Sequence, residues 1–281
     1  MRLVRYGEVG KEKPGILDAQ GAIRDLTGVV GDIDGAALSP ESLAKLRALD
    51  VEALPKVSGK PRLGSPVAGV GKLVAIGLNY SDHAKEANQP IPSEPIIFMK
   101  ATSSICGPND NVVLPRDSKK SDWEVELAFV MGRTAKYVSE ADAPGYVAGY
   151  LICNDVSERH WQLERGPTWD KGKGFDTFAP LGPWVVTADE IRDPQSLAMW
   201  LDVNGKRMQT GNTKTMIFSV AKLVSYISQC MTLKPGDVVT TGTPPGVGLG
   251  VKPDPVFLKA GDVMRLGIDG LGEQRQTVTT G

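Results

Sequence analysis

Short apolar runs separated by glycine- and proline-rich turns constrain the fold of this chain more than any other feature. The 281 residues include 32 glycines and 20 prolines, which favours many turns and short strands. The runs that are typical of strands are residues 72–80, 123–132, 146–156, 182–188, 198–208, 237–244 and 262–272. Helical periodicity is confined to residues 39–54, 157–165 and 216–230. The pattern therefore predicts an α+β fold that is mainly β.

A change in composition near residue 70 suggests two parts. Residues 1–54 alternate short apolar stretches with turns and end in a helical stretch, where Ser39 or Ser42 is a suitable N-cap. The segment from Pro55 to Lys72 is rich in Pro, Gly and Lys, as an extended linker would be. We therefore expect a small β-rich domain and linker over residues 1–70 and the main domain over residues 71–281. Within the main domain, the Asn204-Gly205 pair predicts a β-hairpin turn.

Charge and cysteine content exclude several kinds of partner. The chain has 32 Lys and Arg against 33 Asp and Glu, a formal charge of −1, so no large basic field attracts nucleic acid or anionic lipid. No apolar run is long enough to cross a membrane, and the first residues lack the apolar core of a signal peptide. The three cysteines, Cys106, Cys153 and Cys230, are far apart in the sequence and odd in number. This pattern predicts reduced thiols. A cytoplasmic location is expected.

Two carboxylates interrupt the apolar run at residues 123–132. Glu124 and Glu126 are at i and i+2, so the period of a strand places both on one face. Asp155 ends the next apolar run and supplies a third carboxylate. Like charges on a strand bound for the interior are costly unless a cation neutralises them. Oxygen ligands without histidine suit Mg²⁺ or Mn²⁺ better than Ca²⁺ or Zn²⁺. The alternative is that both glutamates lie on the solvent face of a half-exposed edge strand.

The residues after Asp155 suggest a polar helix face. Asp155, Arg159 and Gln162 are at i, i+4 and i+7, the spacing of one face of a helix. Arg159 could bind a substrate carboxylate through two parallel hydrogen bonds, and Gln162 could donate to a carbonyl group. The alternative is an ordinary surface salt bridge between Asp155 and Arg159.

The chain has only two histidines, so a histidine base must be one of them. His83 is the better candidate because Glu86 follows three residues later and could orient the imidazole. His160 is expected to be an ordinary surface histidine. Lys171 and Lys173 lie in a glycine-flanked turn where the backbone can approach a ligand, although exposed solubilising lysines are the usual alternative.

The glycine-rich segment at residues 240–250 invites comparison with phosphate-binding loops. It contains neither GxxxxGK[ST] nor a GxGxxG that opens a helix, so nucleotide binding is rejected. Most of the segment is expected to be a structural turn. Thr243 could present its hydroxyl and amide groups to a carboxylate.

Five motifs occur in an order and spacing that resemble the fumarylacetoacetate hydrolase family. They are LNYSDHAKE, WEVELAFVMG, NDVSERHWQ, KGKGFDTFAPLGPW and TTGTPPGVG, and they span about residues 70 to 260. The resemblance implies a mixed β-sheet roll and a homodimer. It also implies that Mg²⁺ or Mn²⁺ is held by Glu124, Glu126 and Asp155. The other implied site residues are the His83 and Glu86 dyad, the catalytic Lys173, and the substrate contacts Arg159, Gln162 and Thr243.

The resemblance also implies chemistry on a small 2-oxo acid. The short N-terminal part is similar to that of bacterial sugar-acid enzymes of the family, so we expect hydrolysis of the C3–C4 bond of a 2,4-diketo acid. A substrate such as 2,4-diketo-3-deoxy-L-rhamnonate would give pyruvate and a carboxylic acid such as lactate. The alternatives on the same scaffold are acylpyruvate hydrolysis, oxaloacetate decarboxylation and dienedioate isomerisation. A non-catalytic protein that binds metal or sugar acid is the alternative of another class.

Overall fold

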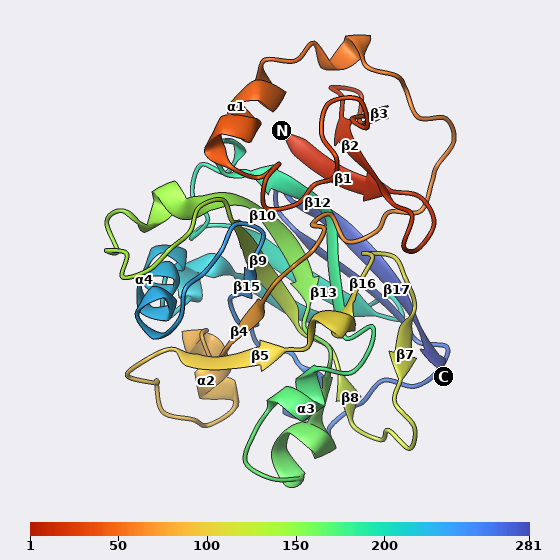
Figure 1. The fold of residues 1–281 in the computed structure, drawn as a ribbon. Helices are drawn as coiled ribbons and strands as arrows, with labels where there is room; N and C mark the ends of the chain where they lie inside the picture. Colours follow the sequence, from red (N-terminus) through yellow and green to blue (C-terminus); the bar gives the residue numbers. More distant parts are fainter.

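Two β-sheets form the core of the molecule (Figure 1), and the computed structural model describes residues 1–281. The ten-stranded sheet contains β1 (Arg2–Tyr6), β2 (Lys13–Leu17), β3 (Ile23–Asp25), β4 (Leu73–Gly77), β5 (Ile96–Lys100), β6 (Ile105–Cys106), β9 (Val125–Met131), β10 (Val147–Asn154), β12 (Ala179–Thr187) and β15 (Val238–Thr240). The five-stranded sheet contains β7 (Val112–Leu114), β13 (Ala198–Val203), β14 (Lys206–Asn212), β16 (Val263–Ile268) and β17 (Gly272–Thr280). A short ribbon pairs β8 (Ser121–Asp122) with β11 (Ser157–Glu158).

Four α-helices accompany the sheets: α1 (Pro40–Arg47), α2 (Ser81–Glu86), α3 (Asp170–Lys173) and α4 (Val220–Cys230). None of them has the length and apolar character that crossing a membrane requires. Strands dominate because the sequence breaks its apolar runs so often with glycine and proline. This architecture confirms the predicted α+β, mainly β fold class.

The larger sheet is mixed and has its most buried strands in the middle. Its order is β3-β2-β1-β12-β10-β9-β15-β4-β5, with β6 paired to β12. Only the β15–β4 and β12–β6 pairs are parallel. Because β9 lies between β10 and β15, it is not an edge strand, and the alternative of a half-exposed edge strand at Glu124 and Glu126 is wrong.

Both faces of β9 are covered, and every residue of the strand is buried. Val125, Leu127 and Phe129 belong to the larger hydrophobic core, which also includes residues of the five-stranded sheet and of α4. Ala128 and Val130 point the other way, into a second core. By the period of a strand, the face that carries Ala128 and Val130 also carries Glu126. Glu126 is therefore held inside the protein by its own strand.

The N-terminal segment is built into the larger sheet. Strand β1 pairs with β12, and Leu3 lies opposite Val185 (Figure 1). Of the two candidate N-caps, Ser39 and not Ser42 caps helix α1. The Ser39 Oγ accepts the N–H of Ser42 at 3.2 Å. The helix packs its leucines into the same core as Val130. The predicted boundary near Val70 therefore lies between two segments that share one sheet and one core.

Two of the predicted helical stretches differ from the structure. Residues 157–165 begin as β11 and continue as one turn of π-helix at His160–Glu164, so Asp155 lies outside any helix. The predicted helix over residues 216–230 begins only at Val220, because Ser219 caps it by accepting the N–H of Lys222. The hairpin turn is confirmed: Asn204 and Gly205 have φ values of 52° and 76° between β13 and β14.

Replacing Leu3 with alanine tests whether residues 1–70 unfold together with the rest. Leu3 is fully buried in the shared core, so Leu3→Ala should lower the free energy of unfolding by about 2–5 kcal/mol. Urea unfolding followed by tryptophan fluorescence and by circular dichroism should give one coincident transition. Val9 is 74% exposed, so Val9→Ala is the control and should change stability by less than about 0.5 kcal/mol. Two separate transitions would show that the segments unfold independently.

Candidate metal centre and active site

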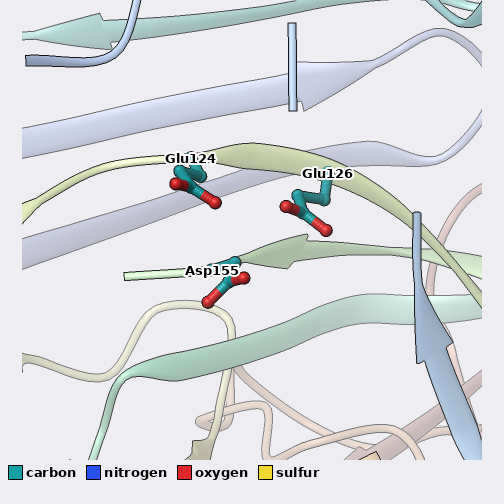
Figure 2. A group of neighbouring side chains, drawn as sticks. All are labelled: Glu124, Glu126 and Asp155. Atoms are coloured by element: carbon teal, nitrogen blue, oxygen red, sulfur yellow. The ribbon is translucent and has the colours of Figure 1, made fainter. Parts of the chain in front are cut away.

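Three carboxylates meet at one end of β9 and β10. Glu124 directly precedes β9, Glu126 lies within it, and Asp155 directly follows β10. Their candidate ligand atoms all lie within 4.8 Å of one another, and all three residues are buried. Figure 2 shows the two glutamates along one chain segment, at the start of β9, and Asp155 on the neighbouring segment. The antiparallel register brings them together, since Cys153 lies opposite Glu126 and the Asp155 N–H donates to the Glu124 carbonyl at 2.9 Å.

Two of the three carboxylates have cationic partners. The Lys173 Nζ donates to Glu124 Oε2 at 2.8 Å and to Asp155 Oδ2 at 2.9 Å. Burial alone would raise the pKa of Glu124, but Lys173 and Arg159 outweigh it and lower that pKa to about 2. Burial likewise opposes the charge on Lys173, yet Asp155 and Glu124 raise the pKa of this lysine above its usual value. Lys173 is therefore a protonated donor at neutral pH.

Glu126 has no cationic partner in contact and accepts the N–H of Gly242 at 2.9 Å. Burial raises the pKa of Glu126 well above its usual value, and the charges of Asp155 and Glu124 raise it further. Glu126 is thus a buried carboxylate that lies beside two others and has no positive charge to balance it. A bound cation would stabilise this arrangement. Three carboxylates without nitrogen or sulfur ligands fit a hard divalent ion.

A second buried lysine reinforces this cluster and was not predicted. Lys100, at the end of β5, donates from Nζ to Asp155 Oδ1 at 2.6 Å and to the carbonyl oxygens of Val156 and Lys173. Its side chain is fully buried. It fixes one oxygen of Asp155 while Lys173 holds the other. The available signal in the sequence was a lysine that closes the apolar run at residues 96–100.

The predicted histidine and glutamate pair is formed on α2. His83 Nδ1 lies 2.9 Å from Glu86 Oε2, and the side chains are 15% and 24% exposed. The imidazole is thus oriented by a carboxylate and still reachable by a ligand. Glu86 is itself fixed, because its Oε1 accepts the N–H of Gly246 at 3.0 Å. His160 is exposed, as predicted.

One segment, residues 241–250, connects the separate parts of the site, and we call it the glycine loop. Three of its glycine N–H groups each donate to a different carboxylate. The pairs are Gly242 with Glu126 (2.9 Å), Gly246 with Glu86 (3.0 Å) and Gly248 with Asp122 (2.6 Å). Gly242 and Gly246 have φ values of 89° and 102°, which favour glycine. The loop was expected to be a structural turn, and the structure adds that it ties the histidine dyad to the acidic cluster.

Arg159 is placed differently from the prediction. Its Nε and Nη2 contact Asp122 Oδ2, each at 2.9 Å, and Nη2 also contacts Glu124 at 2.8 Å. Asp155 pairs with the two lysines instead, so the predicted helix face is wrong, and so is the alternative of a surface salt bridge. The cause is the strand β11, which turns Arg159 inward. Nη1 donates to Gln162 at 2.9 Å, so the two predicted substrate contacts do lie together.

These contacts limit how Arg159 could bind a ligand. Nε and Nη2 are occupied by carboxylates of the protein, so a substrate carboxylate can approach Arg159 through Nη1 without breaking an ion pair. Thr243 is limited in a similar way. Its hydroxyl donates to the Val125 carbonyl at 2.9 Å and accepts from Gln209 at 2.8 Å. A contact from Thr243 to a substrate would therefore come from its backbone.

Comparison with known proteins identifies the family. The family described as Fumarylacetoacetate (FAA) hydrolase C-terminal matches residues 72–279. The chain therefore belongs to the fumarylacetoacetate hydrolase family, which confirms the resemblance that the five motifs indicated. It is an enzyme of this family.

Its relatives include hydrolases and an isomerase. A protein of Burkholderia ambifaria, provisionally named a hydrolase, is 64% identical over 277 residues, which cover 99% of this chain and 98% of the relative. The maleylpyruvate hydrolase from Sphingobium sp. SYK-6, solved in complex with manganese(II) ion and pyruvate, is 31% identical with a TM-score of 0.83 over 100% of both chains. The 2-hydroxyhepta-2,4-diene-1,7-dioate isomerase from Mycobacterium marinum is 34% identical with a TM-score of 0.74, covering 100% of this chain and 98% of its own.

Replacing Glu126 with glutamine tests the metal centre without reference to activity. Glu126→Gln keeps the shape of the side chain and removes the charge that lacks a partner. Mn²⁺ affinity, measured by isothermal titration calorimetry, should fall by at least about tenfold. Glu140 is an exposed glutamate, so Glu140→Gln is the matched control and should bind Mn²⁺ like the unmodified protein. Equal affinity in the two variants would contradict the assignment.

Proposed function

We propose that the protein is a divalent-metal-dependent hydrolase that cleaves the C3–C4 bond of a 2,4-diketo acid into pyruvate and a carboxylic acid. The observation that carries this proposal is the glycine loop, which links the His83 and Glu86 dyad to the carboxylate cluster. Hydrolysis requires both a base for water and a place where enolate charge is stabilised. The dyad would supply the base, and the carboxylate cluster with its bound ion would stabilise the enolate.

The carboxylates Glu124, Glu126 and Asp155 would hold Mg²⁺ or Mn²⁺. A bound ion supplies positive charge and Lewis acidity at the keto-acid end of the substrate. The maleylpyruvate hydrolase of Sphingobium supports this proposal, because its structure contains manganese(II) and pyruvate, and pyruvate is a product expected here.

His83 accepts a proton from water, and that water adds to the C4 carbonyl carbon. Glu86 holds the imidazole in place. The protonated Lys173 and the amide of Gln162 donate to the oxygen that becomes negative at C4. The C3–C4 bond then breaks, its electron pair stays on C3, and a proton returned to C3 completes pyruvate. The C4 fragment leaves as the carboxylic acid.

We infer a sugar-acid substrate such as 2,4-diketo-3-deoxy-L-rhamnonate, which would give pyruvate and lactate. This choice rests on the resemblance of the sequence to bacterial sugar-acid enzymes of the family. Other acylpyruvates are the nearest alternative, since a maleylpyruvate hydrolase shares the fold over its whole length. We further infer that the protein acts in the cytoplasm as a homodimer, with no nucleic acid or membrane partner. The three free cysteines support the cytoplasmic location, and the formal charge of −1 argues against a nucleic-acid or membrane partner. The homodimer rests on the family resemblance alone.

A second candidate is isomerisation of a 2-hydroxydienedioate, favoured by the similarity to the Mycobacterium marinum isomerase. Proton transfer by His83 serves that reaction equally well. Oxaloacetate decarboxylation needs no attacking water and leaves the dyad without a role. Passive binding of a metal or sugar acid would leave the His83 and Glu86 pair unexplained.

A substrate panel separates these functions. The purified protein with Mg²⁺ or Mn²⁺ is incubated with 2,4-diketo-3-deoxy-L-rhamnonate, acetylpyruvate, oxaloacetate and a 2-hydroxydienedioate. Pyruvate release from a diketo acid supports the proposal. Release of CO₂ from oxaloacetate alone would identify a decarboxylase, and an absorbance change of the dienedioate without pyruvate would identify an isomerase. Binding without turnover of any compound would refute catalysis.

Replacing His83 with alanine tests the base. His83→Ala should lower kcat for pyruvate release by about a hundredfold or more, because general-base catalysis is lost, and Mn²⁺ affinity should be unchanged. The exposed His160 provides the matched control, and His160→Ala should retain normal kcat. Normal hydrolysis by the His83→Ala variant would disprove the assignment of the base.

A further inference from the structure

Asp122 is a fully buried carboxylate two residues before Glu124, and it belongs neither to the candidate metal ligands nor to the histidine dyad. Five hydrogen-bond donors from three parts of the chain converge on its two oxygens. They are the Trp123 N–H (2.8 Å), Gly248 N–H (2.6 Å), Leu249 N–H (3.0 Å), and Nε and Nη2 of Arg159 (both 2.9 Å). Oδ1 receives Trp123 and Gly248, and Oδ2 receives Arg159 and Leu249.

On one side, Asp122 contacts Arg159, which is a candidate substrate-binding residue together with Gln162. The guanidinium of Arg159 that Asp122 holds also contacts Glu124 at 2.8 Å and Gln162 at 2.9 Å. Arg159 is itself buried. With both Nε and Nη2 fixed, the plane of the guanidinium is set and Nη1 is aimed toward Gln162.

The other side leads to the histidine dyad through the glycine loop. Asp122 holds Gly248 and Leu249, and the adjacent Trp123 donates its indole N–H to the Gly246 carbonyl at 3.0 Å. The N–H of Gly246 in turn donates to Glu86. The loop backbone passes so close to Asp122 and Val256 that only glycine fits at position 248. A Cβ there would lie 2.0 Å from the Val256 carbonyl oxygen and 2.7 Å from Asp122 Oδ1.

We propose that Asp122 is a positioning residue that fixes Arg159 and the glycine loop together, and so sets the distance between the substrate-binding groups and the His83 and Glu86 dyad. This inference rests on the proposed function for its kinetic consequences only. Both oxygens of Asp122 face donors alone, so an amide at this position would turn an NH₂ group toward an N–H or a guanidinium. The site therefore requires a carboxylate and not merely a polar side chain of the same shape.

The variant Asp122→Asn tests this directly, and Asp237 provides a matched control. Asp237 is also a buried carboxylate, and it accepts from Lys72 Nζ (2.8 Å) and from the backbone N–H groups of Lys72 (2.9 Å) and Lys234 (2.7 Å). It precedes β15, whereas the glycine loop follows that strand. Asp237→Asn thus removes a comparable buried ion pair without touching the glycine loop.

The first measurement is hydrogen–deuterium exchange, which requires no substrate. In Asp122→Asn, exchange should become at least about tenfold faster at the amides of Gly246, Gly248 and Leu249. In Asp237→Asn, exchange at these amides should match the unmodified protein. Equal acceleration in both variants would mean general destabilisation, and no acceleration in Asp122→Asn would mean that the loop is held by other contacts. Either result would overturn the proposal.

The second measurement is kinetic, on whichever diketo acid the substrate panel shows to release pyruvate. Asp122→Asn should raise KM and lower kcat, with a combined loss in kcat/KM between about tenfold and a hundredfold. In an Arg159→Gln background the same substitution should no longer raise KM but should still lower kcat, because only the loop contact remains to be lost. Fully additive effects on KM would show that Asp122 does not act through Arg159.

A separate variant covers the case in which Asp122→Asn fails to fold. Trp123→Phe removes the indole N–H that holds the Gly246 carbonyl and keeps the carboxylate of Asp122 and its contacts to Arg159, so it should lower kcat and speed exchange at Gly246 with KM unchanged. A normal kcat in Trp123→Phe would overturn the role of the loop. If the unmodified protein releases no pyruvate from any diketo acid, the proposed function fails, but the exchange experiment still decides whether Asp122 positions the loop.

Discussion

The rest of the structure depends on the electrostatics of four buried carboxylates at one end of the central strands. Removing Asp122, Glu124, Glu126 and Asp155 from water is costly, and their mutual repulsion adds to the cost. Three buried cations offset most of it: Lys100 and Lys173 hold Asp155, and Arg159 bridges Asp122 and Glu124. Glu126 is left with a backbone N–H alone. That remaining imbalance is what makes the cluster suited to a divalent cation.

The sheet supplies the rigidity that such a cluster needs. Because β9 and β10 are covered on both faces, their ends cannot shift to relieve the repulsion, and the register between them decides which carboxylates meet. The N-terminal segment contributes to this by extending the same sheet and closing the second core. A part of the chain that precedes the family domain thus helps to hold the strands that carry the site.

The glycine loop converts a set of local contacts into one site. Its N–H groups reach the carboxylate cluster, the histidine dyad and Asp122 in turn, at three separate glycines. Structures similar to this chain include a hydrolase and an isomerase, so the scaffold alone does not choose between the two reactions. An imidazole oriented by a carboxylate suits proton transfer in either reaction.

The sequence by itself determined the fold class, the two-residue spacing of Glu124 and Glu126, and the His83 and Glu86 pair three residues apart on one helix. These features are local, and strand or helix periodicity places them. Only the tertiary structure decided that Arg159 turns to Asp122 and not to Asp155, that Lys100 is part of the cluster, and that the glycine loop bridges its parts. Each of those contacts joins residues far apart in the chain, so it depends on sheet register and burial, which local sequence patterns do not encode.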